Sequence, residues 1–212
     1  MGTLATLRDH VIHGKADEAV AALRGLIDSG TPVETVLNEG LVAAMDEVGR
    51  LFQNGEYFMP EMLVSARAMQ RGLELIRPLL REAGVEPLGT VVLGTVRGDL
   101  HDIGKNLVGM ALEGAGFDVV DLGTDVTPES FVDAVKQHRP SILAMSALLT
   151  TTMNNMQDTM RALEEAGLRD DVRVLVGGAP VADSYVNEIE ADGYADDAIA
   201  AVALAKNLTA VA

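Results

Sequence analysis

The first 84 residues repeat their apolar positions every three or four residues, which is typical of amphipathic helices. Leu4, Leu7, Val11 and Ile12 begin one helix, and residues 16–27 form a second after the Gly14 break. A third opens at Pro32 and ends before the Asn54-Gly55 turn, and a fourth runs over 60–80. Because each has one apolar face and the linkers are short, we predict an antiparallel four-helix bundle.

From Thr90 onward, short apolar, β-branched runs alternate with helical segments. The expected strands are 90–96, 117–121, 141–146, 172–176 and a short one near 193–194. The expected helices are 103–115, 127–138, 152–166, 181–189 and 195–208. This alternation predicts a parallel sheet with right-handed crossovers and helices on both faces.

We therefore predict an α/β protein with an N-terminal four-helix bundle and a Rossmann-like, or flavodoxin-like, doubly wound parallel sheet. The turn-rich segment 83–89 divides the two, which gives domains of 1–86 and 87–212. A hydrophobic fraction of 48% is enough for a buried core in both.

The charge and the lack of cysteine narrow the classes of function. The chain has 32 acidic and 16 basic residues, and its net charge of −16 repels phosphate backbones and anionic membranes. We therefore expect no nucleic-acid and no membrane partner. The absence of Cys excludes disulfides, thiolate catalysis and iron–sulfur clusters. Charges throughout the first 20 residues leave no pattern of a signal peptide, so we expect a cytoplasmic protein.

The loops that follow the four clear strands should meet at one edge of the sheet, where ligands of open α/β folds bind. The first of them places His101 between Asp99 and Asp102. Asp99 can orient the imidazole through its second nitrogen, as carboxylates do for metal-bound histidines. Asp102 is equally explained by the favourable field at the start of a helix.

Two further loops carry unusual residues. The third is rich in hydroxyls, and the fourth contains Gly177 and Gly178, where a ligand can approach the backbone. Structural explanations remain open: a polar loop histidine, a helix cap and a tight glycine turn. We interpret His10, His13 and His138 as solvated helix residues. The hydroxyl residues are Ser146, Thr150, Thr151 and Thr152.

Several enzyme classes lack their motifs. A single histidine in the crevice makes a mononuclear zinc hydrolase or a His-Asp phosphohydrolase improbable. There is no Gly-x-Ser-x-Gly elbow and no P-loop. The first strand is followed by Gly94-Thr95-Val96-Arg97-Gly98 rather than by a dinucleotide fingerprint. The crevice therefore calls for another ligand.

One family accounts for the whole pattern. Asp99-x-His101-x-x-Gly104, Ser146-x-Leu148 and Gly177-Gly178 resemble the signature of cobalamin-binding domains, which bind the corrinoid base-off with histidine on cobalt. Residues 56–61 and 65–69 resemble the helical cap of methionine synthase and of small corrinoid proteins in methyltransferase systems. The resemblance implies a cap domain at 1–86 and a cobalamin-binding domain at 87–212.

The resemblance also implies roles for individual residues. His101 would be the lower axial ligand of cobalt, and Asp99 and Thr152 would form a relay behind it, with Thr152 where the family has serine. Phe58 aligns with an aromatic that covers the upper face of the corrin, although it could equally be a core residue of the bundle. The implied cofactor-binding residues are Gly98, Asp99, Leu100, His101, Asp102, Ile103, Gly104, Ser146, Leu148, Thr150, Gly177, Gly178, Ala198 and Phe58.

The resemblance implies a shuttle that carries a methyl group on methylcobalamin or another corrinoid. Its partners would be a substrate:corrinoid methyltransferase, a methylcorrinoid:acceptor methyltransferase acting on tetrahydrofolate or a thiol, and a reductive activase. Catalysis would reside mostly in those partners, and the methyl donor is left open among methanol, methylamines, betaines and methoxyarenes. The alternatives are a subunit of an adenosylcobalamin mutase, a cobalamin-dependent sensor or regulator, and a flavodoxin-like module for another ligand.

Overall fold

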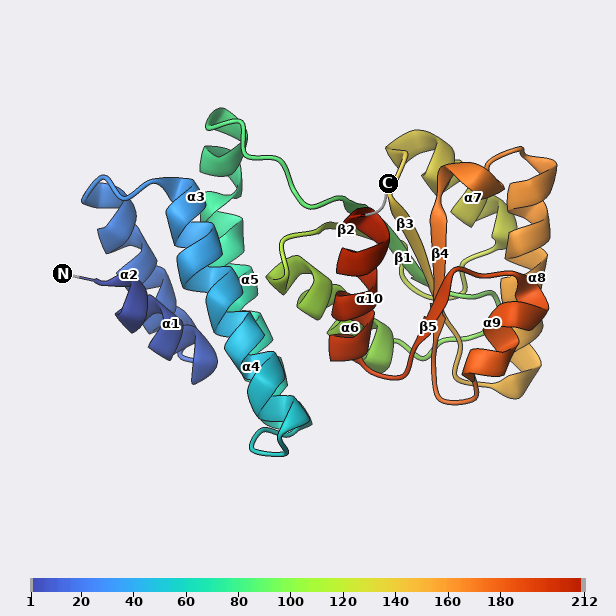
Figure 1. Cartoon of the computed structure of the whole chain (residues 1–212), viewed down its shortest axis with the longest axis horizontal. Coiled ribbons are helices and arrows are strands. Elements are labelled where there is room, and N and C mark those ends of the chain that lie inside the picture. Colours follow the sequence, from blue (N-terminus) through green and yellow to red (C-terminus); the bar gives the residue numbers. More distant parts are fainter. Residues whose placement is uncertain (1, 211–212) are drawn as a thin grey trace. The chain divides into compact units, whose positions relative to one another are not determined.

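The computed structural model describes residues 2–210, which divide into a helical unit and an α/β unit (Figure 1). The helical unit holds residues 2–86 together with 113–116, and the α/β unit holds 87–112 and 117–210. The last two residues of α6 (Ile103–Gly114) thus belong to the helical unit, and the rest of that helix belongs to the α/β unit.

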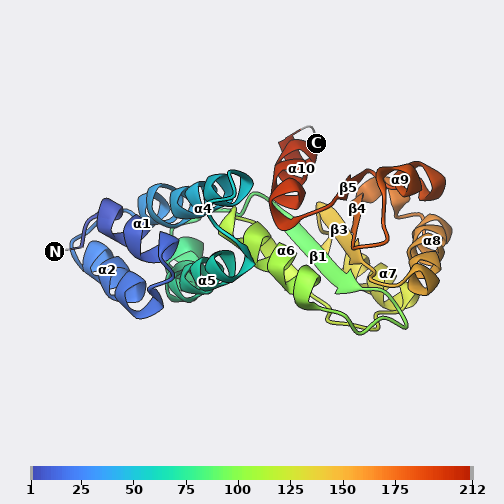
Figure 2. The same ribbon diagram turned by 90° about the horizontal axis from the view of Figure 1, so that it is seen from below.

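The helical unit consists of helices packed side by side (Figure 2), and its longer helices are amphipathic and bury one face each. Fully buried side chains from different helices, among them Leu7, Leu23, Leu41 and Met69, form its core. The predicted helical bundle is confirmed. Its elements are α1 (Leu4–Ile12), α2 (Ala16–Asp28), α3 (Val33–Thr35), η1 (Val36–Val42), α4 (Ala43–Gln53) and α5 (Met59–Glu82).

The third predicted helix is not α-helical throughout. Its middle part, η1, is a π-helix between α3 and α4. Within η1, a Cβ added to Gly40 would lie 2.8 Å from Cδ2 of Leu7, so the glycine allows α1 to approach closely. Apolar residues spaced by three and four stay on one face whether a turn has 3.6 residues or slightly more, so the pattern alone could not reveal the π-turns.

The α/β unit contains a five-stranded parallel sheet in the order β2-β1-β3-β4-β5, which is the flavodoxin-like order. The order reverses at β1, since β2 lies on one side of it and β3 on the other. The loops that leave β1 and β3 diverge from this point, which is where such sheets form their ligand crevice. The strands are β1 (Thr90–Thr95), β2 (Asp118–Asp121), β3 (Ile142–Ser146), β4 (Arg173–Gly177) and β5 (Gly193–Ala195).

Helices cover both faces of the sheet (Figures 1 and 2). Helices α6 and α10 (Ala198–Ala210) lie on one face, and α7 (Pro128–His138), α8 (Thr150–Glu165) and α9 (Asp183–Ile189) lie on the other. A short 3₁₀ turn, η2 (Arg169–Asp171), precedes β4. Helix α8 begins two residues before the predicted start, and α10 begins after the predicted one because 193–195 pairs with β4 as β5.

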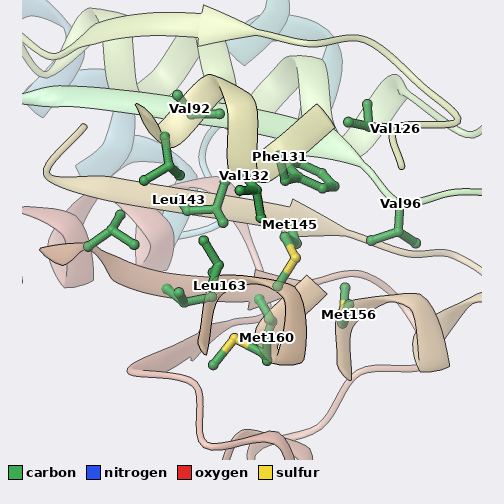
Figure 3. Packing of buried hydrophobic residues seen from close by; sticks show 14 of the residues in the cluster. Val92, Val96, Val126, Phe131, Val132, Leu143, Met145, Met156, Met160 and Leu163 are labelled. Carbon is green, nitrogen blue, oxygen red and sulfur yellow. The ribbon is translucent and has the colours of Figure 1, made fainter. Parts of the chain in front are cut away.

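The face under α7, α8 and α9 contains a cluster of buried hydrophobic side chains (Figure 3). Phe131 of α7 is fully buried against β1, where a Cβ added to Gly94 would lie 2.8 Å from the Phe131 ring. The ring therefore occupies space that the strand leaves free by carrying a glycine. The helix residues Met156, Met160 and Leu163 face strand residues Val92, Leu143 and Met145 in the same cluster.

We expect Phe131→Ala to lower the free energy of unfolding by about 3–5 kcal/mol, because it removes a fully buried ring and leaves a cavity under β1. Urea denaturation followed by circular dichroism measures the change. Lys136→Ala, at an exposed position of the same helix, is the matched control and should change stability by less than about 0.5 kcal/mol. Equal effects of the two variants would contradict this account of the core.

Candidate functional site

The loop between β1 and α6 carries the candidate histidine. Gly98 adopts φ +79°, a left-handed conformation that glycine tolerates, and the Asp99 amide donates to the Val96 carbonyl at 3.1 Å. Helix α6 begins at Ile103. This turn brings Asp99 and His101 to the carboxyl end of β1, as the sequence predicts.

The Asp99 carboxylate is fully buried, and both of its oxygens accept hydrogen bonds. Oδ1 accepts from Nδ1 of His101 at 2.8 Å and from the His101 amide at 3.1 Å. Oδ2 accepts from the Thr152 hydroxyl at 2.7 Å and from the amides of Leu148 at 2.8 Å and Leu149 at 3.3 Å. A single carboxylate therefore ties the β1–α6 loop to the β3–α8 loop.

These donors decide the charge of Asp99. Burial by itself acts to raise the pKa of the carboxyl, but the hydrogen bonds from the Leu148 amide, the Thr152 hydroxyl and His101 outweigh it. They hold the pKa of Asp99 well below its usual range. Asp99 is therefore an anion at neutral pH, although no water reaches it.

An anionic Asp99 fixes the tautomer of His101. Because the carboxylate can only accept, Nδ1 carries the hydrogen, and the lone pair of the neutral imidazole is then on Nε2. The imidazole is 52% exposed, and Nε2 makes no hydrogen bond to any residue between 2 and 210. This is the arrangement by which proteins present a histidine to a metal ion.

Large aliphatic side chains are exposed around His101. Leu100 and Ile103 are 73% and 74% exposed, and Leu148 and Leu149 also lie at the surface; we call these four residues the apolar rim. Exposed aliphatic side chains gathered beside a polar group are typical of a ligand site. A Cβ on Gly104 would meet nothing within 4 Å, so the packing of the chain itself does not require this glycine.

The glycine pair at the end of β4 has a structural explanation. A Cβ on Gly178, which adopts φ +128°, would lie 1.9 Å from the Ala147 carbonyl oxygen, and one on Gly177 would lie 2.9 Å from that of Ala195. Neighbouring strand ends therefore approach too closely for a side chain here. The tight turn accounts for both glycines, and contact with a ligand stays a prediction.

The four hydroxyl residues of the predicted cluster lie on two different elements. Thr150, Thr151 and Thr152 lie in the first turn of α8 rather than in the preceding loop, and the N-cap residue is Leu149, which makes no side-chain capping bond. The interpretation of this cluster as a helix cap is therefore wrong, because the Thr152 hydroxyl points to the buried Asp99 carboxylate. Thr150 is exposed, and Ser146 is half-buried at the end of β3.

Three other predicted residues are each described within their own unit. Asp102 accepts from Asn106 at the start of α6, with 3.1 Å between its Oδ2 and Nδ2 of Asn106, which fits the helix-start interpretation. Ala198 is buried at the start of α10. Phe58 precedes α5 in the helical unit and is 65% exposed, so its interpretation as a core residue of the bundle is wrong.

The sequence reading missed three residues that hold this site together. Asp125 accepts the Gly98 amide at 2.7 Å, and Asn155 donates to the Arg97 carbonyl at 3.0 Å. Lys105 is buried and pairs with Asp121 of β2. None belongs to a recognisable motif, although Asp125 falls in a loop predicted to face the crevice.

Residues 2–210 contain neither a cluster of metal-ligating side chains nor a helix suited to span a membrane. No group of three or more His, Cys, Asp or Glu side chains in this range could hold a metal ion. None of the helices described is both long and apolar enough to cross a membrane.

Comparisons with known proteins support the same class of ligand. A family model described as a B12 binding domain matches residues 89–203, and a second model of that description matches 3–77. The dimethylamine corrinoid protein 1 of Methanosarcina acetivorans is 41% identical over 98% of this chain and 97% of its own length. The trimethylamine corrinoid protein of Methanosarcina barkeri is 44% identical over 94% and 91%.

Solved structures extend the likeness to the whole fold. The methanol:cobalamin methyltransferase complex MtaBC from Methanosarcina barkeri contains a chain that is 32% identical with a TM-score of 0.88, covering 99% of this chain and 80% of that one. A cobalamin-binding protein from Desulfitobacterium hafniense DCB-2 is 28% identical with a TM-score of 0.79, covering 98% and 99%.

Matches over both units define this chain as a B12-binding protein with a helical and a Rossmann-like part. Within that class, it belongs to the corrinoid-protein family that includes the dimethylamine and trimethylamine corrinoid proteins of Methanosarcina. The predicted resemblance and the predicted fold class are confirmed.

The lowered pKa of Asp99 predicts how the fold responds to acid. Because its folded-state pKa lies below the unfolded value of about 4, the carboxylate stabilises the fold fully above that value, and this stabilisation is lost as the pH falls toward the folded-state pKa. We expect Asp99→Asn to lower the free energy of unfolding by about 1–3 kcal/mol at pH 7. The NH₂ group of the asparagine would face N–H and O–H donors that now bond to a carboxylate oxygen.

The difference between wild type and Asp99→Asn should be constant from pH 7 to pH 5 and shrink below about pH 4. Urea denaturation of the cofactor-free protein at each pH measures it. Asp102→Asn, which changes an exposed carboxyl of the same loop that accepts from Asn106, is the control and should show no such dependence. A difference that grows as the pH falls would contradict the assignment of Asp99 as an anion.

Proposed function

We propose that this chain is a methyl-carrying corrinoid protein in which His101 is the lower axial ligand of cobalt. It would carry the methyl group between a substrate:corrinoid methyltransferase and a methylcorrinoid:acceptor methyltransferase that acts on tetrahydrofolate or a thiol. The observation that carries the proposal is the His101 imidazole, which is oriented by a buried anion and leaves Nε2 free beside the apolar rim. The relatives named corrinoid proteins support it.

The residues present fit a corrinoid. Because a macrocycle supplies most of the ligands of its metal, one imidazole with a free Nε2 would suffice, whereas a bare ion would need a cluster of side chains. The apolar rim offers aliphatic contact around that imidazole. The empty space beside Gly104 leaves room for a flat ligand to approach the backbone.

When bound, the cobalt of the corrinoid would supply the methyl-carrying chemistry. The part of the chain itself would be to hold a proton between His101 and Asp99. If Nε2 served as a ligand, Asp99 would accept the Nδ1 hydrogen; if His101 were released, Nε2 would take up a proton, and the adjacent anion would stabilise the imidazolium. Thr152 and the two loop amides keep Asp99 charged throughout. Ligation is thereby coupled to protonation of the His101–Asp99 pair.

Other residues would position the cofactor. We propose that Leu100, Ile103 and Leu148 contact the macrocycle and exclude water from the imidazole. Phe58, exposed at the start of α5, would contribute an aromatic face from the helical unit. The loop residues Gly98, Asp102 and Gly104 would surround the lower face, and the residues proposed to line a slot for the nucleotide tail are Ser146, Thr150, Gly177, Gly178 and Ala198.

The comparisons also suggest the partners. The relatives are named for dimethylamine and trimethylamine, and the similar MtaBC structure is titled as a methyltransferase complex. We therefore propose a methylated amine as the first donor class to test, delivered by a partner methyltransferase. The acceptor-side methyltransferase and a reductive activase complete the proposed system.

His101→Ala should retain cobalamin but lose histidine ligation. We expect the wild-type protein, mixed with hydroxocobalamin and freed of excess ligand, to keep a base-off visible spectrum. After reduction to cobalt(II), its EPR lines should be split by one axial nitrogen. The variant should lose that splitting, because no other imidazole lies in the loop. His138→Ala, in an exposed position at the end of α7, is the control and should match wild type.

Unchanged nitrogen splitting in His101→Ala, with a visible spectrum that is still base-off, would refute the ligand assignment, because the cofactor's own base is then not the source of the nitrogen. A wild-type protein that retains no cobalamin would refute the function as a whole.

Thr152→Val should shift the pH at which His101 is released while leaving cobalamin bound. Loss of the hydroxyl makes Asp99 a stronger acceptor for the imidazole hydrogen, which favours the imidazolium and moves release to higher pH by up to about one unit. Visible spectra of the loaded protein between pH 4 and 9 measure the midpoint. Thr152→Ser keeps the donor and should titrate like wild type. A shift to lower pH, or loss of cobalamin, would contradict the relay.

A further inference from the structure

Asp125, in the loop after β2, has a backbone conformation that needs an explanation. It adopts φ +56°, and the other non-glycine residues between 2 and 210 with positive φ are Arg139 and Glu190. Those two are the C-cap residues of α7 and α9, where left-handed conformations are common. Asp125 ends no helix. A strained residue of this kind persists where surrounding contacts hold it, and such positions gather at functional sites.

The contacts of Asp125 are directed at the β1–α6 loop. Its Oδ1 accepts the Gly98 amide at 2.7 Å, and its own amide donates to the Asp99 carbonyl at 3.0 Å. Side chain and backbone of one residue therefore bracket the Gly98–Asp99 segment from both ends. The left-handed conformation is what allows the amide and the carboxylate of Asp125 to face the same neighbour.

The loop that carries Asp125 is itself anchored to the sheet. Val96 and Val126 form a parallel bridge, and the Val126 amide donates to the Thr95 carbonyl at 3.0 Å. Asp125 is thus next to a residue that is hydrogen-bonded to β1. Gly98, by contrast, is a glycine, whose backbone is less restricted than that of any other residue type. On the other side of the loop, Asn155 of α8 holds the Arg97 carbonyl at 3.0 Å.

We propose that Asp125 is a positioning residue for axial ligation: it holds the Gly98–Asp99 segment so that His101 stands ready to bind cobalt. The proposal rests on the corrinoid function proposed above. Asp125 makes no hydrogen bond to the imidazole. Its effect would be to change the fraction of molecules in which the loop has the conformation needed for ligation. When that fraction falls, the apparent ligation constant falls in proportion.

The test compares Asp125→Gly with Asp125→Asn. Glycine adopts φ +56° without strain and removes the acceptor, whereas asparagine tolerates the same conformation and keeps an oxygen for the Gly98 amide. We expect Asp125→Gly to lower the ratio of histidine-ligated to unligated cobalamin by up to about tenfold, the equivalent of one charge-assisted hydrogen bond. Asp125→Asn should stay within about twofold of wild type.

The ratio is read from the nitrogen-split and unsplit components of the cobalt(II) EPR spectrum at one pH, and thermal unfolding of each cofactor-free variant reports on the fold. Glu190→Gly is the matched control, because it also replaces an exposed acidic residue at positive φ by glycine, far from this loop. It should leave the ratio unchanged.

The outcomes are distinct. If the wild-type protein shows histidine ligation and Asp125→Gly keeps the same ratio, the positioning role is wrong although the proposed function survives. Equal losses in Asp125→Gly and Asp125→Asn would also overturn it, because the acceptor oxygen would then be irrelevant. If the wild-type protein itself shows no nitrogen splitting, the corrinoid function with His101 as ligand fails first. A loss confined to Asp125→Gly supports the proposal.

Discussion

The arrangement of the site depends on one buried anion. Asp99 has no contact with solvent, and donors from the β1–α6 and β3–α8 loops satisfy both of its oxygens. A buried carboxylate is costly unless it is hydrogen-bonded in this way, so the two loops cannot separate without exposing or stranding a charge. The same hydrogen bonds that join the loops also fix the tautomer of His101. Structural support and chemical function therefore have a common origin.

Much of the fold follows from the pattern of residues. The three-and-four spacing of the first 84 residues and the strand–helix alternation from Thr90 predict both units, because burial of one helical face and of both sheet faces leaves few other architectures. The motif around His101 is also legible, since Asp99 and His101 are two positions apart. The π-turns of η1 and the start of α8 cannot be predicted from the sequence, because both depend on contacts with distant segments.

The residues that sequence reading misses share a cause. Asp125 and Asn155 act across 27 and 58 positions of the chain, so no local spacing marks them. Loop composition marks Thr152 as one of several hydroxyl residues near the crevice and leaves a helix cap open, whereas its role behind Asp99 is indicated only by the resemblance to a family. The glycine pair at 177–178 has a structural reason that spacing alone does not reveal, the close approach of carbonyl oxygens from neighbouring strand ends, and its contact with a ligand stays a prediction.

At Leu148 and Leu149, the backbone and the side chain have separate places in the site. Both residues serve the Asp99 anion through backbone amides, while their side chains are exposed in the apolar rim. Backbone donors survive any substitution other than proline. Substitutions at these two positions can therefore change the exposed surface beside His101 without removing the amide donors that hold the charge behind it. The electrostatic part of the site depends on the backbone, and its steric part depends on side chains.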